Sequence, residues 1–207
     1  MIAGFVKPPQ DRMLVLWATA SYAALIALCV QDPGLLGRLG ASRRDGLTGC
    51  LTYHATRDEL DCEINRSARG DLPLSVCFID LDDFKKVNDI HGHLLGNEVL
   101  AEVAEILRNG VRSFDTVGRY GGDEFVAILP QTHRCSAQAL AERLRSQLAT
   151  TPHRSLLRPL TASTGVAEWV PGTTSEQLLA AADAALLSAK GRRTGVNTAR
   201  KASATAA

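Results

Sequence analysis

The stretch RYGGDEF, residues 119–125, combines two glycines and two acids between two short runs, 116–120 and 125–129, that have strand composition. Glycine adopts positive φ without steric cost, so the stretch predicts a β-hairpin. Its tip would present Asp123 and Glu124, and carboxylate oxygens are ligands that Mg²⁺ prefers. A polar turn without chemistry is also consistent with these residues alone, because glycine and aspartate are common in turns.

Length and composition indicate a globular chain with one domain of ordinary size and a short appendage. The 207 residues are 45% hydrophobic and 22% charged. A formal net charge of +1 argues against a broad nucleic-acid-binding surface, so we expect no nucleic-acid partner. The five cysteines match no zinc spacing and their odd number gives no closed disulfide framework, which favours reduced thiols.

The N-terminal segment, residues 1–31, differs from the rest of the chain. Residues 13–30 carry no charge, and 18 residues is the lower limit for a membrane-spanning helix. Basic residues are more numerous after this stretch than before it, which favours a catalytic region on the cytoplasmic side of the inner membrane. The alternatives are a buried or dimer-forming helix, a signal peptide, or the remnant of a longer sensory region. Residues 32–44 contain glycine and proline and read as a linker, and 198–207 as a flexible tail.

The remaining residues predict an α/β domain in which a mixed sheet is flanked by helices. Apolar spacing predicts strands over 74–79 and 160–169 in addition to the hairpin. The expected helices cover 52–69, 96–108, 136–148 and 175–190, the last with Ser175 as its N-cap.

A second acid, Asp80, directly follows the apolar strand 74–79, so its carboxylate would emerge at a strand end. If the hairpin lies beside this strand, Asp80 and Asp123 would converge on one metal ion. Such a site suits phosphoryl or nucleotidyl transfer, in which positioning and metal charge dominate catalysis. Lys85 is close enough in sequence to reach a triphosphate as a point charge.

Several motifs in register give the chain a family resemblance. They are Asp45-Gly46-Leu47-Thr48, the acidic stretch 80–88, Gly92-His93, the turn 121–125, and Ala182-Asp183 followed by Ala189-Lys190. With these motifs the chain resembles the GGDEF domain, the catalytic domain of diguanylate cyclases, over residues 45–197.

The resemblance implies a palm-like fold, similar to that of nucleotide cyclases and polymerases, and a homodimer. Two GTP molecules on two facing domains would condense into cyclic di-GMP. Mg²⁺, or Mn²⁺ in its place, would be held by Asp80, Asp123 and the carbonyl of Leu81. Glu124 would lie beside the metal ion and the attacking 3′-hydroxyl group.

The resemblance also implies a set of nucleotide-binding residues and a product-binding site. Asn88 and Asn97 would contact guanine, and the cations at 85, 119 and 190 (Lys85, Arg119 and Lys190) would neutralise the triphosphate. The run 112–115 matches the product-inhibition motif Arg-x-x-Asp, in which Arg112 and Asp115 would bind guanine. A surface salt bridge is the alternative for this pair.

The chain departs from the family at three places. Asn97 stands where the family usually has Asp, and an amide offers one acceptor and one donor group instead of two acceptors. The phosphate-binding Arg expected near the C-terminus is replaced by Val196, with Arg192 and Arg193 as nearby substitutes. The usual Asn-Arg pair after the Leu-Thr-Gly segment is Thr52-Tyr53.

Three alternatives to a GTP-specific cyclase therefore stay open. One is a cyclase with relaxed base selectivity that makes a mixed cyclic dinucleotide, which Asn97 would permit. The second is a catalytically weak receptor that binds cyclic di-GMP at the Arg-x-x-Asp motif. The third is a binding module that assembles membrane proteins through its N-terminal helix.

Overall fold

A computed structural model describes residues 42–151, 156, 159–192 and 196–198. The apolar segment 13–30 and the residues after 198 lie outside this part of the chain, so the expected membrane helix and tail do too. Within the described stretches, no helix is both long enough and apolar enough to cross a membrane.

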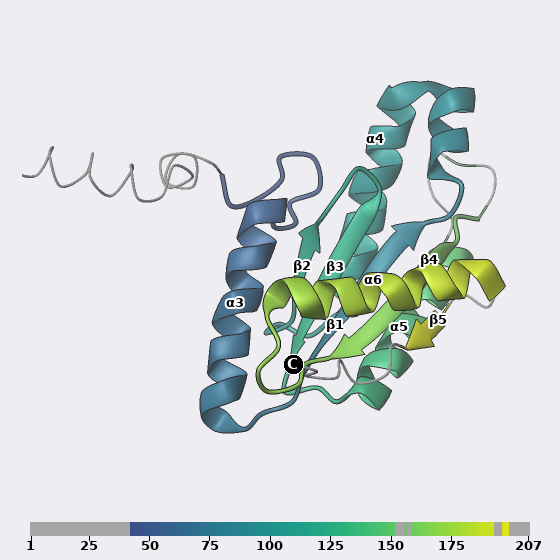
Figure 1. Ribbon diagram of the computed structural model, residues 1–207. Helices are drawn as coiled ribbons and strands as arrows, with labels where there is room; N and C mark the ends of the chain where they lie inside the picture. Colours follow the sequence, from purple (N-terminus) through teal and green to yellow (C-terminus); the bar gives the residue numbers. More distant parts are fainter. Residues whose placement is uncertain (1–41, 152–155, 157–158, 193–195, 199–207) are drawn as a thin grey trace, which may run out of the picture. The chain divides into compact units, whose positions relative to one another are not determined.

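The described chain forms one five-stranded mixed sheet with helices on both faces, as the sequence predicts (Figure 1). The strands lie in the order β2-β3-β1-β4-β5; all neighbouring pairs are antiparallel except β4 and β5. In chain order the elements are α3 (Tyr53–Gly70), β1 (Leu74–Leu81), α4 (Phe84–Gly110), β2 (Thr116–Arg119), β3 (Glu124–Pro130), α5 (Arg134–Thr150), β4 (Ala162–Glu168), α6 (Ser175–Arg192) and β5 (Val196–Thr198).

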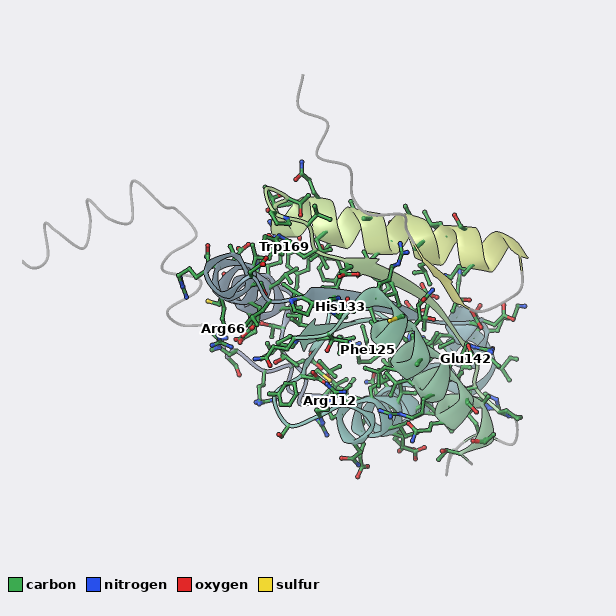
Figure 2. The ribbon with its side chains drawn as sticks, turned by 90° about the horizontal axis from the view of Figure 1, so that it is seen from below. Arg66, Arg112, Phe125, His133, Glu142 and Trp169 are labelled. Carbon is green, nitrogen blue, oxygen red and sulfur yellow. The ribbon has the colours of Figure 1, made fainter. Side chains whose placement is uncertain are left out.

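Strand β1 is central and is buried on both faces, because its side chains alternate between two hydrophobic cores. Cys77 and Ile79 pack in the core formed with α4 and α5, whereas Val76 and Phe78 pack in the core formed with α3 and α6. Figure 2 shows the sheet between these two helical layers, with Phe125 of β3 near its middle. By the same alternation, Asp80 at the end of β1 belongs to the face that α6 covers.

The hairpin of β2 and β3 confirms the interpretation of residues 116–129, but the glycines act differently from the expectation. Neither Gly121 nor Gly122 is among the residues with positive φ. A Cβ atom on Gly121 would lie 2.3 Å from the carboxylate of Glu124, so this glycine leaves room for an acid side chain. The turn closes through the backbone N–H of Tyr120, which donates to the carbonyl of Glu124 at 2.8 Å.

The start of α6 also corrects the sequence interpretation by one residue. The N-cap is Thr174, whose hydroxyl accepts from the N–H of Gln177 at 3.3 Å. In return, the side chain of Gln177 accepts from the N–H of Thr174 at 2.9 Å. This reciprocal pair is a capping box, so Ser175 is the first residue of the helix instead of its cap.

Candidate active site

The end of β1 and the hairpin turn meet in the sheet, as the sequence predicts for Asp80 and Asp123. The backbone N–H of Leu81 donates to the carbonyl of Asp123 at 3.3 Å. Asp80 and Glu124 are paired across the β1–β3 ladder. Directly paired residues have side chains on the same face of a sheet, so Asp80 and Glu124 both lie on the side of α6.

Helix α6 brings a lysine and a fourth acid, Asp183, to this edge. Nζ of Lys190 lies 2.6 Å from Oδ1 of Asp80 in a half-buried ion pair. Asp183, seven residues earlier and therefore on the same side of the helix, is close enough to raise the pKa of Glu124. The resemblance motifs at 182–183 and 189–190 thus lie over the paired acids.

The helix can approach this closely because Gly165 of β4 has no side chain. A Cβ atom at Gly165 would lie 2.1 Å from the carbonyl oxygen of Ala182 and 2.3 Å from the backbone nitrogen of Leu186. Both are backbone atoms, which cannot rotate away as a side chain can. Gly165 therefore sets the distance between α6 and the sheet, and with it the position of Lys190.

The clustered carboxylates disfavour one another's charged forms. Burial raises the pKa of Asp80, and Asp123 and Asp82 raise it further, although the hydrogen bond and charge of Lys190 act against them. Burial likewise raises the pKa of Glu124, with Asp80, Asp123 and Asp183 adding to the effect. Negative charge at this edge exceeds what the single nearby lysine offsets, which is the electrostatic condition of a cation site.

The donor set fits a hard divalent cation. No group of three or more His, Cys, Asp or Glu side chains in the described part of the chain is arranged to hold a metal ion alone. The set implied by the family resemblance, however, consists of two carboxylates and one backbone carbonyl, from Asp80, Asp123 and Leu81. Mg²⁺ is commonly held by one or two carboxylates together with substrate phosphates, so two acids are sufficient.

Arg119 anchors the turn to the segment before α3. Its Nη2 and Nε donate to the carbonyl of Gly122 at 2.8 and 3.2 Å, and its Nη1 lies 3.2 Å from Oδ1 of Asp45. Asp45 also accepts from the N–H and the hydroxyl of Thr48 at 2.9 and 2.6 Å. Burial raises the pKa of Asp45, but the hydrogen bonds from Thr48 and Arg119 lower it below its usual value. These contacts place Arg119 at the base of the turn.

The two asparagines lie on the two arms of a bent helix. Helix α4 changes direction at Gly92, where φ is 81° and ψ is 162° (Figure 1). The first arm folds back so that Oδ1 of Asn88 occupies the space beside Gly96, only 1.9 Å from where a Cβ would stand. Asn97 follows directly and is exposed, and so is Lys85 on the first arm. The bend therefore brings the side chain of Asn88 close to the backbone beside Asn97.

The Arg-x-x-Asp motif lies at the opposite end of β2 from the turn. The N–H of Arg112 donates to Oδ2 of Asp115 at 2.9 Å, and Oδ1 of Asp115 is buried without a hydrogen-bond partner in the described residues. Burial raises the pKa of Asp115, although Arg112 and Arg143 lower it. Arg112 is exposed. A cavity of about 500 Å³ here is lined by several arginines, namely Arg43, Arg44, Arg108 and Arg112.

Sequence reasoning missed four of the charged residues in these arrangements. In the sequence Asp183 and Asp45 stand only as parts of motifs, and Arg143 and Arg108 belong to no motif. Arg143 is on α5, 31 positions after Arg112, so only the packing of α5 brings it near Asp115. Asp183 and Lys190 are seven residues apart, a spacing that puts two residues on the same side of a helix. This spacing is the signal for their proximity that the sequence contains.

Known proteins share both the sequence and the fold of this chain. The family described as "Diguanylate cyclase, GGDEF domain" matches residues 42–195. The response regulator PleD of Caulobacter vibrioides is 40% identical over 151 residues, which are 70% of this chain and 33% of that protein. Diguanylate cyclase DgcP of Pseudomonas aeruginosa is 39% identical over 150 residues, which are 70% of this chain and 22% of the relative. The chain thus spans a third or less of the length of these curated relatives.

Solved structures agree with the sequence relatives. The GGDEF domain of DgcB from Caulobacter crescentus, in complex with c-di-GMP, superposes with a TM-score of 0.73 at 31% identity, covering 78% of this chain and 95% of that one. Diguanylate cyclase SiaD of Pseudomonas aeruginosa, in complex with its activator SiaC, superposes with a TM-score of 0.72 at 34% identity, covering 91% of this chain and 74% of that one. The fold and the acids at the β1 edge place the chain in the class of mixed α/β domains with a GGDEF hairpin. This chain belongs to the GGDEF diguanylate cyclase family.

Proposed function

We propose that this protein is a diguanylate cyclase that condenses two GTP molecules into cyclic di-GMP and releases pyrophosphate. The observation that supports this most directly is the convergence of Asp80, Asp123 and Glu124 at one sheet edge, with Lys190 opposite them. Crowded carboxylates with raised pKa values fit a site that binds a divalent cation and a polyphosphate. The relatives named as diguanylate cyclases point to the same activity.

The metal ligands in this proposal are the carboxylates of Asp80 and Asp123 and the carbonyl of Leu81. When bound, Mg²⁺ (or Mn²⁺) supplies positive charge that offsets the phosphates and favours attack at the α-phosphorus. Glu124 hydrogen-bonds the attacking 3′-hydroxyl, and its raised pKa makes it a better proton acceptor than an ordinary glutamate.

The rest of the nucleotide lies over α4. Asn88 and Asn97 contact the base between the two arms of the helix, and Lys85 and Lys190 neutralise the phosphates. Helix N-termini present free N–H groups and a positive dipole, so the start of α4 also suits an anion. Arg119 acts on the phosphates through the turn that it holds, because its guanidinium already donates to Gly122 and Asp45.

One domain holds one nucleotide, so the reaction needs a homodimer in which two domains face each other. Each 3′-hydroxyl then attacks the α-phosphorus on the partner domain, forming a phosphodiester bond and expelling pyrophosphate. Arg112 and Asp115 bind the product and inhibit the enzyme. A weak cyclic di-GMP receptor that uses only this second site is disfavoured, because such a receptor has no need of the acids at the β1 edge.

Mixed cyclic dinucleotide synthesis is the second candidate, and Asn97 is the observation behind it. An exposed amide accepts one hydrogen bond and donates others, so it fits an adenine edge as well as a guanine edge. The packing of Asn88 against Gly96 favours retained guanine selection. Incubation with equal GTP and ATP and Mg²⁺, followed by mass analysis, distinguishes the two: pure cyclic di-GMP rejects relaxed selectivity.

The primary test is Mg²⁺-dependent release of pyrophosphate from GTP by the purified full chain. Asp123→Asn removes a proposed metal ligand, and we expect a loss of at least about 100-fold, since even outer-shell changes around metal sites cost 10- to 100-fold. An inactive wild-type dimer, or an Asp123→Asn variant with the wild-type rate, would reject the proposal that the protein is a diguanylate cyclase.

Membrane association through residues 13–30 is a separate proposal. It predicts that the full chain sediments with inner membranes, with the catalytic domain in the cytoplasm, and that deletion of 13–30 releases it. Release by high salt with 13–30 intact would reject the proposal, because a buried apolar helix does not depend on ionic attraction.

A further inference from the structure

A cavity of about 660 Å³ adjoins the paired acids on the side of Lys190. The residues that line it come from the loop before β4, the first residues of that strand, the turn before α4, and the helices α5 and α6. Lys190 therefore borders both the acids and this cavity. Its lining residues are Asp82, Asp83, Arg145, Thr161, Ala162, Ser163 and Lys190.

The acids that line this cavity already have donors. The carboxylate of Asp82 accepts from the hydroxyls of Thr161 and Ser163 at 2.8 and 2.7 Å. Oδ1 of Asp83 is 2.8 Å from the ammonium of Lys86. Both acids of the lining thus have a local hydrogen-bond or ion-pair partner. The cations among the lining residues are Lys190 and Arg145.

Arg145 forms a two-bond ion pair with Glu142, one turn earlier on α5. Its Nε and Nη2 donate to the two carboxylate oxygens of Glu142 at 3.1 and 2.5 Å. Half of the Glu142 side chain is exposed (52%), and such solvent-accessible pairs contribute little. Figure 2 shows Glu142 on α5, in the helical layer opposite α6. The pKa of Arg145 is raised first by Glu142 and also by Asp82, which places the guanidinium near the base of the cavity.

The family resemblance leads us to expect a phosphate-binding arginine on this side of the site, and the chain has valine at that position. Val196, which stands at that position, begins β5 and pairs with Thr164 of β4. Lys190 is already committed to Asp80 at 2.6 Å. A nucleotide triphosphate carries several negative charges at its terminal phosphate groups, so a further cation beside Lys190 and Lys85 would strengthen its binding.

We propose that Arg145 binds the terminal phosphate of the nucleotide next to Lys190 and takes the place of the arginine that Val196 replaces. This inference rests on the proposed cyclase function and names a further specificity residue for it. The guanidinium is planar and presents paired N–H donors, so it can exchange the exposed Glu142 carboxylate for two phosphate oxygens. It distinguishes a triphosphate from a monophosphate, because only the longer chain reaches α5.

The test is equilibrium binding to the full chain, measured by calorimetry with guanosine 5′-(α,β-methylene)triphosphate and with GMP. The methylene group prevents pyrophosphate release, so binding is seen without turnover. Arg145→Gln is expected to weaken the triphosphate analogue about tenfold, the scale of one charge-assisted hydrogen bond, and to leave GMP unchanged. Arg145→Lys keeps the charge without the fork and should retain part of the affinity.

Glu142→Gln is the matched control, because it removes the same helix ion pair while keeping the arginine. If Arg145 only stabilises α5, the Gln variants at 142 and 145 will behave alike; if it binds phosphate, Glu142→Gln will bind the analogue at least as tightly as the wild type. Equal affinity of wild type and Arg145→Gln, or a parallel loss for GMP, overturns the assignment. If the wild type releases pyrophosphate and the Arg145→Gln variant binds the analogue as tightly as the wild type, only this inference is rejected. A wild type that neither binds the analogue nor turns over GTP rejects the cyclase function with it.

Discussion

At the scale of single residues, the charged carboxylate of Glu124 opposes the stability of the folded protein. Its carboxylate lies beside Asp80, Asp123 and Asp183, and its pKa is raised by burial and by these charges. A raised folded-state pKa means that the folded protein binds the proton more tightly than the unfolded chain. Ionisation of Glu124 therefore lowers the free energy of unfolding as the pH rises from the pKa of the unfolded chain through the pKa of the folded protein. This loss remains at neutral pH.

Glu124→Gln should therefore raise the melting temperature of the metal-free protein at pH 7. The expected gain is roughly 0.5–1 kcal/mol, the scale of partly exposed charge interactions. At pH 4 the carboxyl group is largely protonated in the folded state, so the gain should shrink. Thermal unfolding in EDTA at both pH values measures it.

Glu105→Gln serves as the control, because Glu105 is an exposed acid on the outer side of α4. It should leave the melting temperature unchanged at both pH values. If Glu124→Gln destabilises the protein at pH 7, then the carboxylate has a favourable partner and charge crowding is the wrong account of this edge.

At the scale of elements, local and non-local features differ in how far the sequence predicts them. The hairpin and β1 are read correctly because turn composition and apolar runs are local signals. The N-cap of α6 is displaced by one residue, since Thr174 and Ser175 both carry hydroxyls and only the reciprocal bond to Gln177 distinguishes them.

The position of α6 over the sheet is a non-local feature, and the sequence does not reveal it. Nothing in the run around Gly165 indicates that backbone atoms of Ala182 and Leu186 will lie against it. The ion pair between Lys190 and Asp80 depends on this packing, and so does the proximity of Asp183 to Glu124. The candidate acids could thus be named from motifs, whereas their counter-charges could be placed only from the structure.

Gly165→Ala should therefore destabilise the protein by about 1–3 kcal/mol, the usual cost of overpacking, and displace Lys190 from Asp80. Urea unfolding measures the loss. Gly46→Ala is the matched control, because a Cβ atom there meets nothing within 4 Å. Equal stability of the Gly165→Ala variant and the wild type would mean that α6 tolerates a greater distance from the sheet.

At the scale of the whole molecule, strand β2 connects the Arg-x-x-Asp motif to the GGDEF turn. Asp115 directly precedes the strand and the turn directly follows it, only four residues later. Oδ1 of Asp115, which is buried and has no hydrogen-bond partner among the residues that the structure describes, can accept a hydrogen bond from a guanine base. A ligand held there contacts an element whose other end carries the proposed catalytic acids.

Arg112→Ala should abolish inhibition by added cyclic di-GMP while leaving the initial rate of pyrophosphate release within about twofold, because surface substitutions away from the site rarely exceed 0.5 kcal/mol. Rates measured with increasing product provide the readout. Arg69→Ala, at an exposed arginine in the last turn of α3, is the control and should keep the inhibition. Unchanged inhibition of Arg112→Ala would move the product site elsewhere.

The proposed requirement for two facing domains makes a prediction about mixtures of wild-type and variant subunits. If each nucleotide must be activated on its own domain, a dimer of one wild-type and one Asp123→Asn subunit cannot close both phosphodiester bonds. Mixing the wild type with a tenfold excess of the variant, under conditions of subunit exchange, should lower cyclic di-GMP formation per wild-type subunit to about a tenth by mass action. The same total concentration of wild type alone sets the reference rate. Undiminished activity in the mixture would show that one intact domain suffices, and would contradict the shared site.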